Sequence, residues 1–234
     1  MIGLMKEMLR KTSSIDPETP LAEVRFVALD TELTGLDEKN DCIVSVGAVR
    51  MTGGVIDIGD SFYQLINPDK ELSAGSIVIH EITPSEVAAM PSIAAVLADF
   101  LEFAGNDVFV GHFISLDLSF INREMKRILK HKVLNPAIDT YSIYEWLSKR
   151  LKGSGCFAAR PDGYRLYDIV KCFDVPVNCA HNAIMDAYTT ALLFQRFLPL
   201  LAEAGVCSIG DLLSMGKPFK GGDRFLINSE FNNF

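Results

Sequence analysis

One stretch decides the fold, and it runs Val24-Arg25-Phe26-Val27-Ala28-Leu29-Asp30-Thr31-Glu32-Leu33-Thr34-Gly35. Its apolar residues predict a buried strand over residues 24–30. Because side chains two residues apart in a strand project to the same face, Asp30 and Glu32 place two carboxylates side by side where the strand leaves the core. Such a pair can hold a hard divalent cation, although a lone Asp-x-Glu is more often two solvated acids at the end of a strand.

Two more strands are predicted directly after this stretch. Residues 42–51 alternate with the two-residue period of a strand, with valine and alanine on one face. The pair Gly53-Gly54 then signals a turn that leads into a strand over residues 61–67. We therefore expect the first three strands to form an antiparallel meander.

Helical periodicity takes over after these strands. Residues 91–104 carry apolar side chains at a period near 3.6, and Gly105-Asn106 is a suitable C-terminal signal. A short strand is predicted over residues 107–110, and Ser115 is the expected N-cap of a helix that continues to residue 130. Further helices are predicted over residues 141–151, 164–173 and 182–204, with a mobile glycine-containing loop over residues 152–163. This order of elements predicts an α/β layer fold.

Composition favours a single soluble domain. The chain has 234 residues, of which 49% are hydrophobic, so it can bury one full core. No apolar run approaches the roughly 20 residues needed to cross a bilayer, and residues 1–11 mix charged and apolar side chains too closely for a secretory signal. We expect no membrane association and a cytoplasmic location. Five scattered cysteines without CxxC spacing predict reduced thiols: Cys42, Cys156, Cys172, Cys179 and Cys207.

The formal net charge of -8 argues against a surface that coats duplex nucleic acid, because such surfaces gain affinity from an excess of Lys and Arg. It does not argue against an enzyme that grips one strand end, since carboxylates that hold divalent cations are neutralised in the working site. Two basic clusters could guide a phosphate backbone, although a solvated surface explains them equally well. They comprise Arg123, Lys126, Arg127, Lys130 and Lys132 on a predicted helix and its end, and Lys149, Arg150, Lys152, Arg160 and Arg165 around the predicted loop.

Two further acids stand at the start of predicted helices. Asp117 follows the strand over residues 107–110, at the strand end where open α/β sheets place their ligands. Asn182 is a good N-cap, which would leave His181 in the preceding loop and Asp186 one turn inside the helix, so that both could face one site. Taken alone, each has an ordinary explanation: an acid that complements a helix dipole, or a surface histidine.

Taken together, the order Asp-x-Glu, Asp and His-x-x-x-x-Asp resembles the three exonuclease motifs of the DnaQ-like superfamily. The match is to the DEDDh branch, whose last motif carries a histidine, and to the type of exonuclease domain found in the DNA polymerase III epsilon subunit. The resemblance covers residues 24–201 and includes neighbours of the motifs. These are Thr34-Gly35-Leu36, Pro68, His80-x-Ile82-Thr83 and Asp139-Thr140.

This resemblance implies a ribonuclease H-like fold, with a mixed sheet of about five strands, the first three antiparallel, flanked by helices. It also implies a 3′-5′ exonuclease that uses two divalent cations, Mg²⁺ or Mn²⁺, to release nucleoside 5′-monophosphates. Asp30, Glu32 and Asp186 would surround one ion, and Asp30 would bridge to a second ion near Asp117. His181 would accept a proton from the attacking water, since an imidazole with a pKa near about 6.5 can act as a base at neutral pH.

The expected substrate is the 3′ end of single-stranded nucleic acid, with DNA favoured. A DNA polymerase or another replication protein is the candidate partner, because any proofreading would need a partner chain; the oligomeric state stays open. Leu33, Phe113 and Glu81 depart from the family pattern, which bears on substrate preference more than on catalysis. The residues expected to hold the terminal nucleotide are Leu33, Thr34, Gly35, Leu36, His112 and Phe113.

Three other functions stay open. An RNA substrate, as in the oligoribonuclease and RNase T branches, or a small phosphodiester would use the same metal pair. A non-catalytic nucleic-acid-binding module is the third alternative, although all four acids and the histidine are present. We expect the exonuclease domain over residues 24–205, between an extension over residues 1–23, helical or disordered, and a C-terminal helix and tail over residues 206–234.

Overall fold

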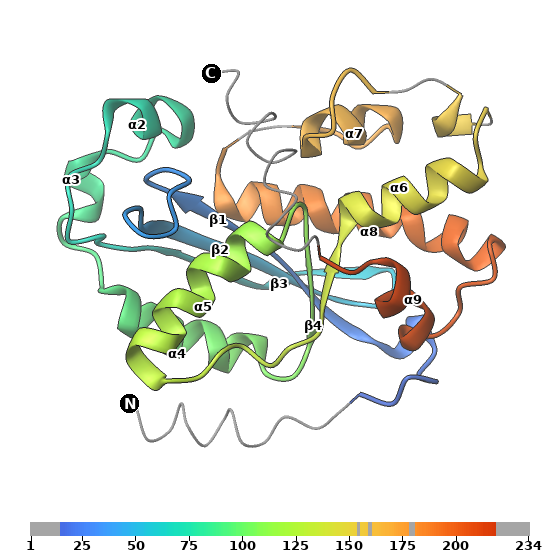
Figure 1. Cartoon of the computed structure of the whole chain (residues 1–234), viewed down its shortest axis with the longest axis horizontal. Helices are drawn as coiled ribbons and strands as arrows, with labels where there is room; N and C mark the ends of the chain where they lie inside the picture. The colour runs from blue at the N-terminus through green and yellow to red at the C-terminus, as the bar shows by residue number, and fades with distance from the viewer. Residues whose placement is uncertain (1–14, 154, 159–160, 178–180, 219–234) are drawn as a thin grey trace.

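A computed structural model describes residues 15–153, 155–158, 161–177 and 181–218. At its centre lies a five-stranded sheet in the order β3-β2-β1-β4-β5 (Figure 1). Antiparallel pairing joins β1, β2 and β3, whereas β4 pairs in parallel with β1 and with β5. The strands are β1 (Arg25–Leu33), β2 (Ile43–Thr52), β3 (Val55–Leu65), β4 (Val108–Gly111) and β5 (Ala137–Asp139). The mixed sheet with three antiparallel strands is therefore confirmed.

The β2–β3 hairpin is tighter than predicted. Thr52 pairs with Val55, so Gly53-Gly54 forms the whole connection, and Gly53 takes a φ of 52°, which glycine adopts without a steric cost. The third strand consequently begins at Val55, six residues before the predicted start. Its first half is largely exposed on the edge of the sheet and contains glycine and aspartate, so it lacks an apolar pattern.

Helices cover both faces of the sheet (Figure 1). Those over residues 91–104, 115–130, 141–151, 164–173 and 182–204 were predicted to within about two residues at each end. The short helices α2 and α3 and the three-residue strand β5 were not predicted. The helices are α2 (Ala74–His80), α3 (Pro84–Val87), α4 (Ile93–Ala104), α5 (Ser115–Leu129), α6 (Thr140–Arg150), α7 (Leu166–Cys172), α8 (Ala183–Glu203) and α9 (Ile209–Met215).

One predicted cap is wrong. Ser115 is the first residue of α5, and the N-cap position belongs to Ile114, whose side chain cannot cap. The reason is that the chain turns at Phe113, which has a φ of 53°, and Ile114 already has helical dihedral angles.

The core lies on both sides of the sheet because β1 is buried on both faces. Phe26 and Ala28 face a cluster that includes Phe194 of α8, whereas Val27 and Leu29 face a second cluster on the side of α4 and α5. This two-sided burial explains why β1 is a continuous apolar run rather than an alternating one. Each fully buried Phe or Leu contributes roughly 1.5–3 kcal/mol. The strand that carries the two acids is thus held firmly from both sides.

The flanking segments pack on the same core. Leu21, in a short 3-10 helix (Leu21–Glu23), is buried, as are Val206 and Ile209 of the C-terminal segment, and Pro20 forms a β-bridge with Ser208. The expected C-terminal helix is α9. The division into 1–23, 24–205 and 206–234 stays a prediction, and residues 1–14 and 219–234 lie outside the described part of the chain.

Across the described ranges, no helix combines the length and the apolar character that a bilayer span requires. The thiols of Cys42, Cys156, Cys172 and Cys207 are free, whereas Cys179 is outside the described residues, as is Arg160 of the second basic cluster.

Candidate active site

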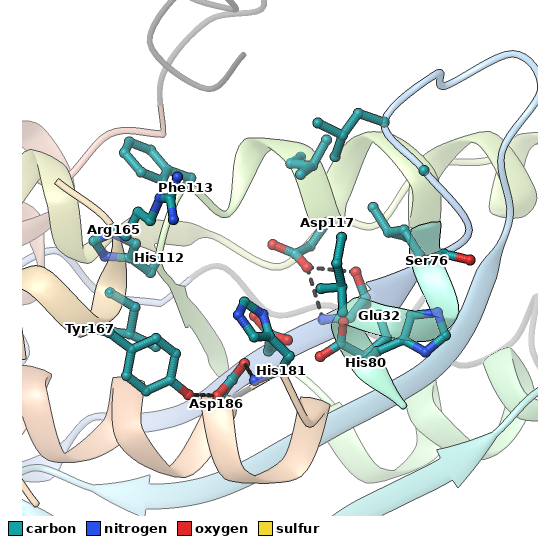
Figure 2. A pocket seen from close by; sticks show the side chains of 18 of the residues that line it. Glu32, Ser76, His80, His112, Phe113, Asp117, Arg165, Tyr167, His181 and Asp186 are labelled. Atoms are coloured by element: carbon teal, nitrogen blue, oxygen red, sulfur yellow. Dashed lines mark hydrogen bonds between the residues drawn. The ribbon is translucent and has the colours of Figure 1, made fainter. Parts of the chain in front are cut away.

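The end of β1 meets the first turns of α5 and α8 at one cavity of about 540 Å³ (Figure 2). β1 carries Asp30 and Glu32, α5 carries Asp117 in its first turn, and α8 carries Asp186 in its first turn. These four acids all line the cavity together with His181. The structure therefore brings together residues that the sequence separates by more than 150 positions.

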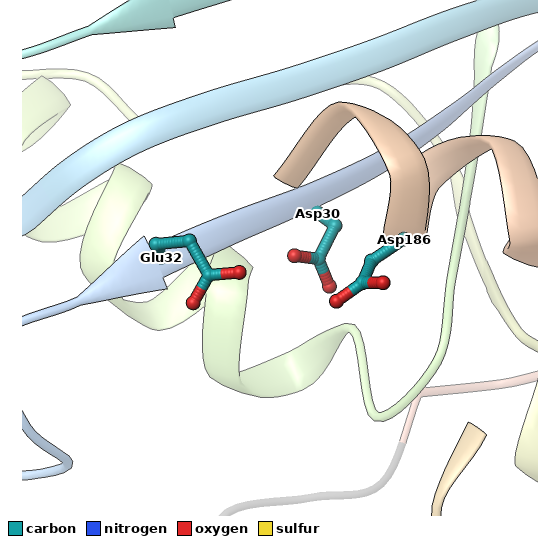
Figure 3. A group of neighbouring side chains, drawn as sticks. All are labelled: Asp30, Glu32 and Asp186. Atoms are coloured by element: carbon teal, nitrogen blue, oxygen red, sulfur yellow. The ribbon is translucent and has the colours of Figure 1, made fainter. Parts of the chain in front are cut away.

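A glycine sets the distance between α8 and the sheet. Gly47 of β2 is the register partner of Asp30, and a Cβ atom on it would lie 2.2 Å from the carbonyl carbon of Ala183 in the first turn of α8. Only glycine permits such a close approach of helix backbone to strand. Consequently Asp186, on that first turn, lies against Asp30 (Figure 3).

The turn before α8 is organised around Asp186. Asn182 is the N-cap, and its side chain accepts a hydrogen bond from the amide of Met185, as predicted. The amide of His181, at a φ of 60°, donates to Asp186 Oδ2 over 3.1 Å. The hydroxyl of Tyr167 donates to Asp186 Oδ1 from the other side (Figure 2). His181 and Asp186 therefore face the same cavity, as the sequence predicted.

Asp30, Glu32 and Asp186 form a group that fits a metal ion. Each offers a carboxylate oxygen, and these oxygens lie within 4.8 Å of one another (Figure 3). Burial, followed by repulsion from neighbouring acids, raises the pKa of Asp30 well above its ordinary value and that of Glu32 to about 8. Burial also raises the pKa of Asp186 to about 6. A hard divalent cation, which prefers oxygen ligands, would stabilise the charged form of these acids because it removes the repulsion between them.

Asp117 lies beside this group without belonging to it. Its Oδ1 accepts hydrogen bonds from the amide of Thr31 over 3.0 Å and from the Thr31 hydroxyl over 2.6 Å. Burial raises the pKa of Asp117 to about 7, although these hydrogen bonds oppose the rise. Its charge is also the second cause, after burial, of the raised pKa of Asp30. Asp117, which is itself buried, thus adds a fourth carboxylate to the same cavity.

His112 and Phe113 line the cavity but are held by structural contacts. His112 Nε2 lies 2.8 Å from the carbonyl oxygen of Tyr164, which can only accept, so Nε2 donates. Nδ1 faces the hydroxyl of Thr140 at 2.8 Å, and burial lowers the pKa of His112 to about 4. Phe113 is only 4% exposed, and its amide donates to Asp139 Oδ1. The imidazole of His112 is therefore a neutral structural link.

The predicted nucleotide-binding residues of the first motif divide into two groups. Leu33, Gly35 and Leu36 line the cavity. Thr34 does not: its amide donates to the carbonyl oxygen of Cys42 over 2.9 Å, and its hydroxyl donates to Asp41. Thr34, which the sequence suggested for nucleotide binding, therefore uses both its amide and its hydroxyl within the hairpin.

Several cavity residues were not predicted as site residues. Ser76, Ile79 and His80 come from the unpredicted helix α2, and Tyr167 comes from α7. Arg165, a member of the second basic cluster, also lines the cavity.

Two arginines of the first basic cluster make contacts within the protein. Arg123 donates to the carbonyl oxygens of Glu38 and Asp41 and pairs with buried Glu124, which also pairs with Arg127. These contacts tie α5 to the loop after β1. Arg123 therefore supports the wall of the site from behind.

The mixed five-stranded sheet, with a group of acids at the end of its central strand, matches the ribonuclease H-like fold of exonucleases. The exonuclease family model, named for RNase T, matches residues 27–194. The chain belongs to this exonuclease family.

Named relatives agree with this family, and a solved structure agrees with the fold. DNA polymerase III PolC-type of Bacillus subtilis is 34% identical over 187 residues, which are 80% of this chain but 12% of that protein. The chain thus spans only a small part of its PolC-type relatives. DNA polymerase III subunit epsilon of Aquifex aeolicus is 31% identical over 215 residues, 92% of this chain and 99% of that protein. E. coli Exonuclease I in complex with a dT13 oligonucleotide shares the fold, with a TM-score of 0.67 at 18% identity, covering 78% of this chain and 43% of that one.

Proposed function

We propose that this chain is a 3′-5′ exonuclease that hydrolyses the terminal phosphodiester of single-stranded DNA and releases nucleoside 5′-monophosphates. The observation that carries the proposal is the group of Asp30, Glu32 and Asp186, whose oxygens lie within 4.8 Å of one another in one cavity with Asp117 and His181. Membership of the exonuclease family supports hydrolysis at a chain end. The names of the polymerase relatives and the dT13 complex support DNA as the substrate.

The donor set supports two Mg²⁺ or Mn²⁺ ions. Asp30, Glu32 and Asp186 would hold one ion, and Asp30 with Asp117 would hold the other. The group offers oxygen atoms alone, with no thiolate or imidazole, which favours these hard cations over zinc. Divalent cations bound there supply an activated water and stabilise the departing 3′ oxygen.

His181 is proposed as the general base. Burial, and then the positive charge of Arg165, lower the pKa of His181, so the imidazole is neutral at neutral pH and can take a proton from water. Its backbone is fixed by the hydrogen bond to Asp186, which keeps the base next to the acid group. The Tyr167 hydroxyl fixes the other oxygen of Asp186.

The terminal nucleoside is proposed to lie between β1 and α2. Leu33, Leu36, Ile79 and Leu116 give this part of the cavity an apolar lining. Apolar contact with the face of a base tolerates every base, as an exonuclease that removes successive nucleotides requires.

We also propose that the chain works with a DNA polymerase. The support is that its relatives are named as a polymerase and as a polymerase III subunit. Gel filtration of the chain mixed with the replicative polymerase of its own organism tests this. Co-elution is the expected result, and separate elution at micromolar concentrations would count against the partnership.

The central experiment compares 5′-labelled single-stranded DNA with RNA of the same sequence. The proteins are the wild type, Asp30→Asn, His181→Ala and, as a matched charge control, Glu102→Gln on the exposed face of α4. We expect a Mg²⁺-dependent ladder that shortens from the 3′ end, abolished by a chelator and by the two site variants, and unchanged in the control.

Three outcomes would contradict the proposal in different ways. A folded wild type that cleaves neither polymer would refute the exonuclease function. Faster degradation of RNA than of DNA would replace the proposed substrate by RNA. Full activity of Asp30→Asn would remove the acid group from the mechanism.

A further inference from the structure

The cavity has two chemically different ends. In Figure 2, Ser76 and His80 lie toward one end, Arg165 and Phe113 lie toward the other, and the acids with His181 lie between them. Only the first end continues into the apolar lining where the terminal nucleoside is proposed to lie. Apart from the effect of the Arg165 charge on the pKa of His181, the second end has no part in the function proposed above.

Arg165 brings a positive charge to this second end, and Asp168, three residues further on, adds a carboxylate to the cavity lining. Among the described residues that line the cavity, it is the one with a permanent positive charge. Two divalent cations would balance the negative charges of the four acids of the site. The scissile phosphate would then bring a further negative charge to the acids. A longer strand brings a further negative charge with every additional phosphate. Arg165 is suited to such a phosphate because its guanidinium can bind two phosphate oxygens at once.

The backbone that carries Arg165 is anchored on both sides. The preceding carbonyl, of Tyr164, accepts the hydrogen bond from His112, and the Tyr164 ring packs against Tyr141 with centroids 5.4 Å apart. The following residue, Leu166, is 8% exposed and belongs to the core. Arg165 itself is half-buried. The backbone at Arg165 is therefore already ordered before a ligand binds, so binding costs little additional entropy there.

The order of groups along the cavity assigns a phosphate to Arg165. A strand whose last nucleoside lies between β1 and α2, with its scissile phosphate at the acids, must continue in the 5′ direction past the acids. We propose that Arg165 binds the internucleotide phosphate next to the scissile phosphate on its 5′ side, and thereby makes the site prefer a polynucleotide end to a small phosphodiester. This inference rests on the proposed exonuclease function.

Two substrates distinguish the contribution of this phosphate from that of the scissile phosphate. The p-nitrophenyl ester of thymidine 5′-monophosphate has a single phosphodiester, whereas a single-stranded thymidine oligomer has a phosphate at the next position as well. The variants are Arg165→Gln and Arg165→Lys, with Arg196→Gln as control, because Arg196 is an exposed cation on α8 outside the cavity. Thermal melting confirms that each variant is folded.

We expect Arg165→Gln to raise KM for the oligomer about tenfold to a hundredfold, since a hydrogen bond to a charged group is lost. The slope of log(kcat/KM) against log[salt] should become shallower by about 0.7, the value of one phosphate contact on a single strand. At about pH 8, where His181 is neutral with or without the Arg165 charge, hydrolysis of the ester should stay within about twofold of the wild type. Arg165→Lys should recover part of the loss, and Arg196→Gln should leave the kinetics on both substrates unchanged.

A second measurement does not depend on catalysis. Fluorescence anisotropy of the labelled oligomer in Ca²⁺ should show the same loss of affinity in Arg165→Gln. Equal losses of activity on the ester and the oligomer would place Arg165 at the scissile phosphate and overturn the inference. Unchanged activity on both substrates would also overturn it. A wild type that cleaves neither substrate, but binds the oligomer through Arg165, would refute the proposed function and leave the phosphate contact standing.

Discussion

Replacing Gly47 by alanine tests how the fold positions the site. Gly47 stands opposite Asp30 in the β1–β2 pairing and beneath the first turn of α8. An added Cβ would lie 2.2 Å from the Ala183 carbonyl carbon, 2.3 Å from its oxygen and 2.3 Å from the Ile184 amide nitrogen. All three are backbone atoms, so no side chain can rotate away to relieve the contact. The helix end itself must move.

The size of the movement follows from these distances. Ordinary contact begins near 3.4 Å, so the first turn of α8 must retreat by about 1 Å. Overpacking of this kind costs about 1–3 kcal/mol of stability. Asp186 would move with the turn and away from Asp30, and a displacement of about 1 Å in a catalytic group costs about a hundredfold in rate. We therefore expect a modest loss of stability and a large loss of activity.

Urea denaturation and oligomer degradation over a Mg²⁺ titration measure the two effects. Gly54→Ala is the matched control, because a Cβ there would make only an ordinary 3.6 Å contact with Leu198. We expect Gly47→Ala to need more Mg²⁺ and to stay about a hundredfold slower at saturation, with the control near the wild type. If Gly47→Ala were as active as the control, α8 would not depend on the close approach at Gly47 and the positioning argument would fail.

Three further predictions concern residues around the cavity. Tyr167→Phe removes the hydroxyl that orients Asp186, so isothermal titration should show roughly tenfold weaker Mg²⁺ binding; unchanged affinity would exclude that role. Phe113→Asn places at a φ of 53° a residue that adopts this conformation more readily, but it removes a buried ring. Urea melts should therefore show a net destabilisation of about 2 kcal/mol, and a stabilised variant would show that backbone strain dominates. For His112, the lowered pKa means that only the unfolded chain takes up a proton between pH 6.5 and about 4. The stability advantage of wild type over His112→Gln should therefore fall by at most about 3 kcal/mol as the pH falls through that window, and a pH-independent difference would contradict it.

The parts of the fold that the sequence predicted are those with enough residues to show a period. β1 and β2 are apolar over most of their length, and α8 begins at an Asn cap that marks it clearly. β5 has three residues and exists because it pairs with β4, a contact that no local pattern encodes. For α3 a usable signal was missed, since Thr83 and Glu86 form a capping box around Pro84.

The residues of the site likewise divide into those that the sequence could predict and those that it could not. The acids and His181 could be predicted because their types and order match a family pattern, and the structure places them in one cavity. Tyr167 could not, and Arg165 could be predicted only as one member of a basic cluster, because their proximity to Asp186 and His181 comes from the packing of α7 against α8. The commitment of the Thr34 amide to Cys42 depends on hairpin geometry, which the Thr-Gly sequence does not reveal.

Two turns explain why acids so distant in sequence meet at β1. Phe113 and His181 both take positive φ angles, of 53° and 60°, immediately before helices that carry an acid in the first turn. A left-handed residue costs a bulky side chain about 1–2 kcal/mol, so each turn persists only because its surroundings enforce it. The Phe113 amide is held by Asp139, and the His181 amide by Asp186 itself. In the second turn the proposed metal ligand thus also stabilises the backbone that presents the proposed base, and a change at Asp186 should displace His181 as well as weaken metal binding.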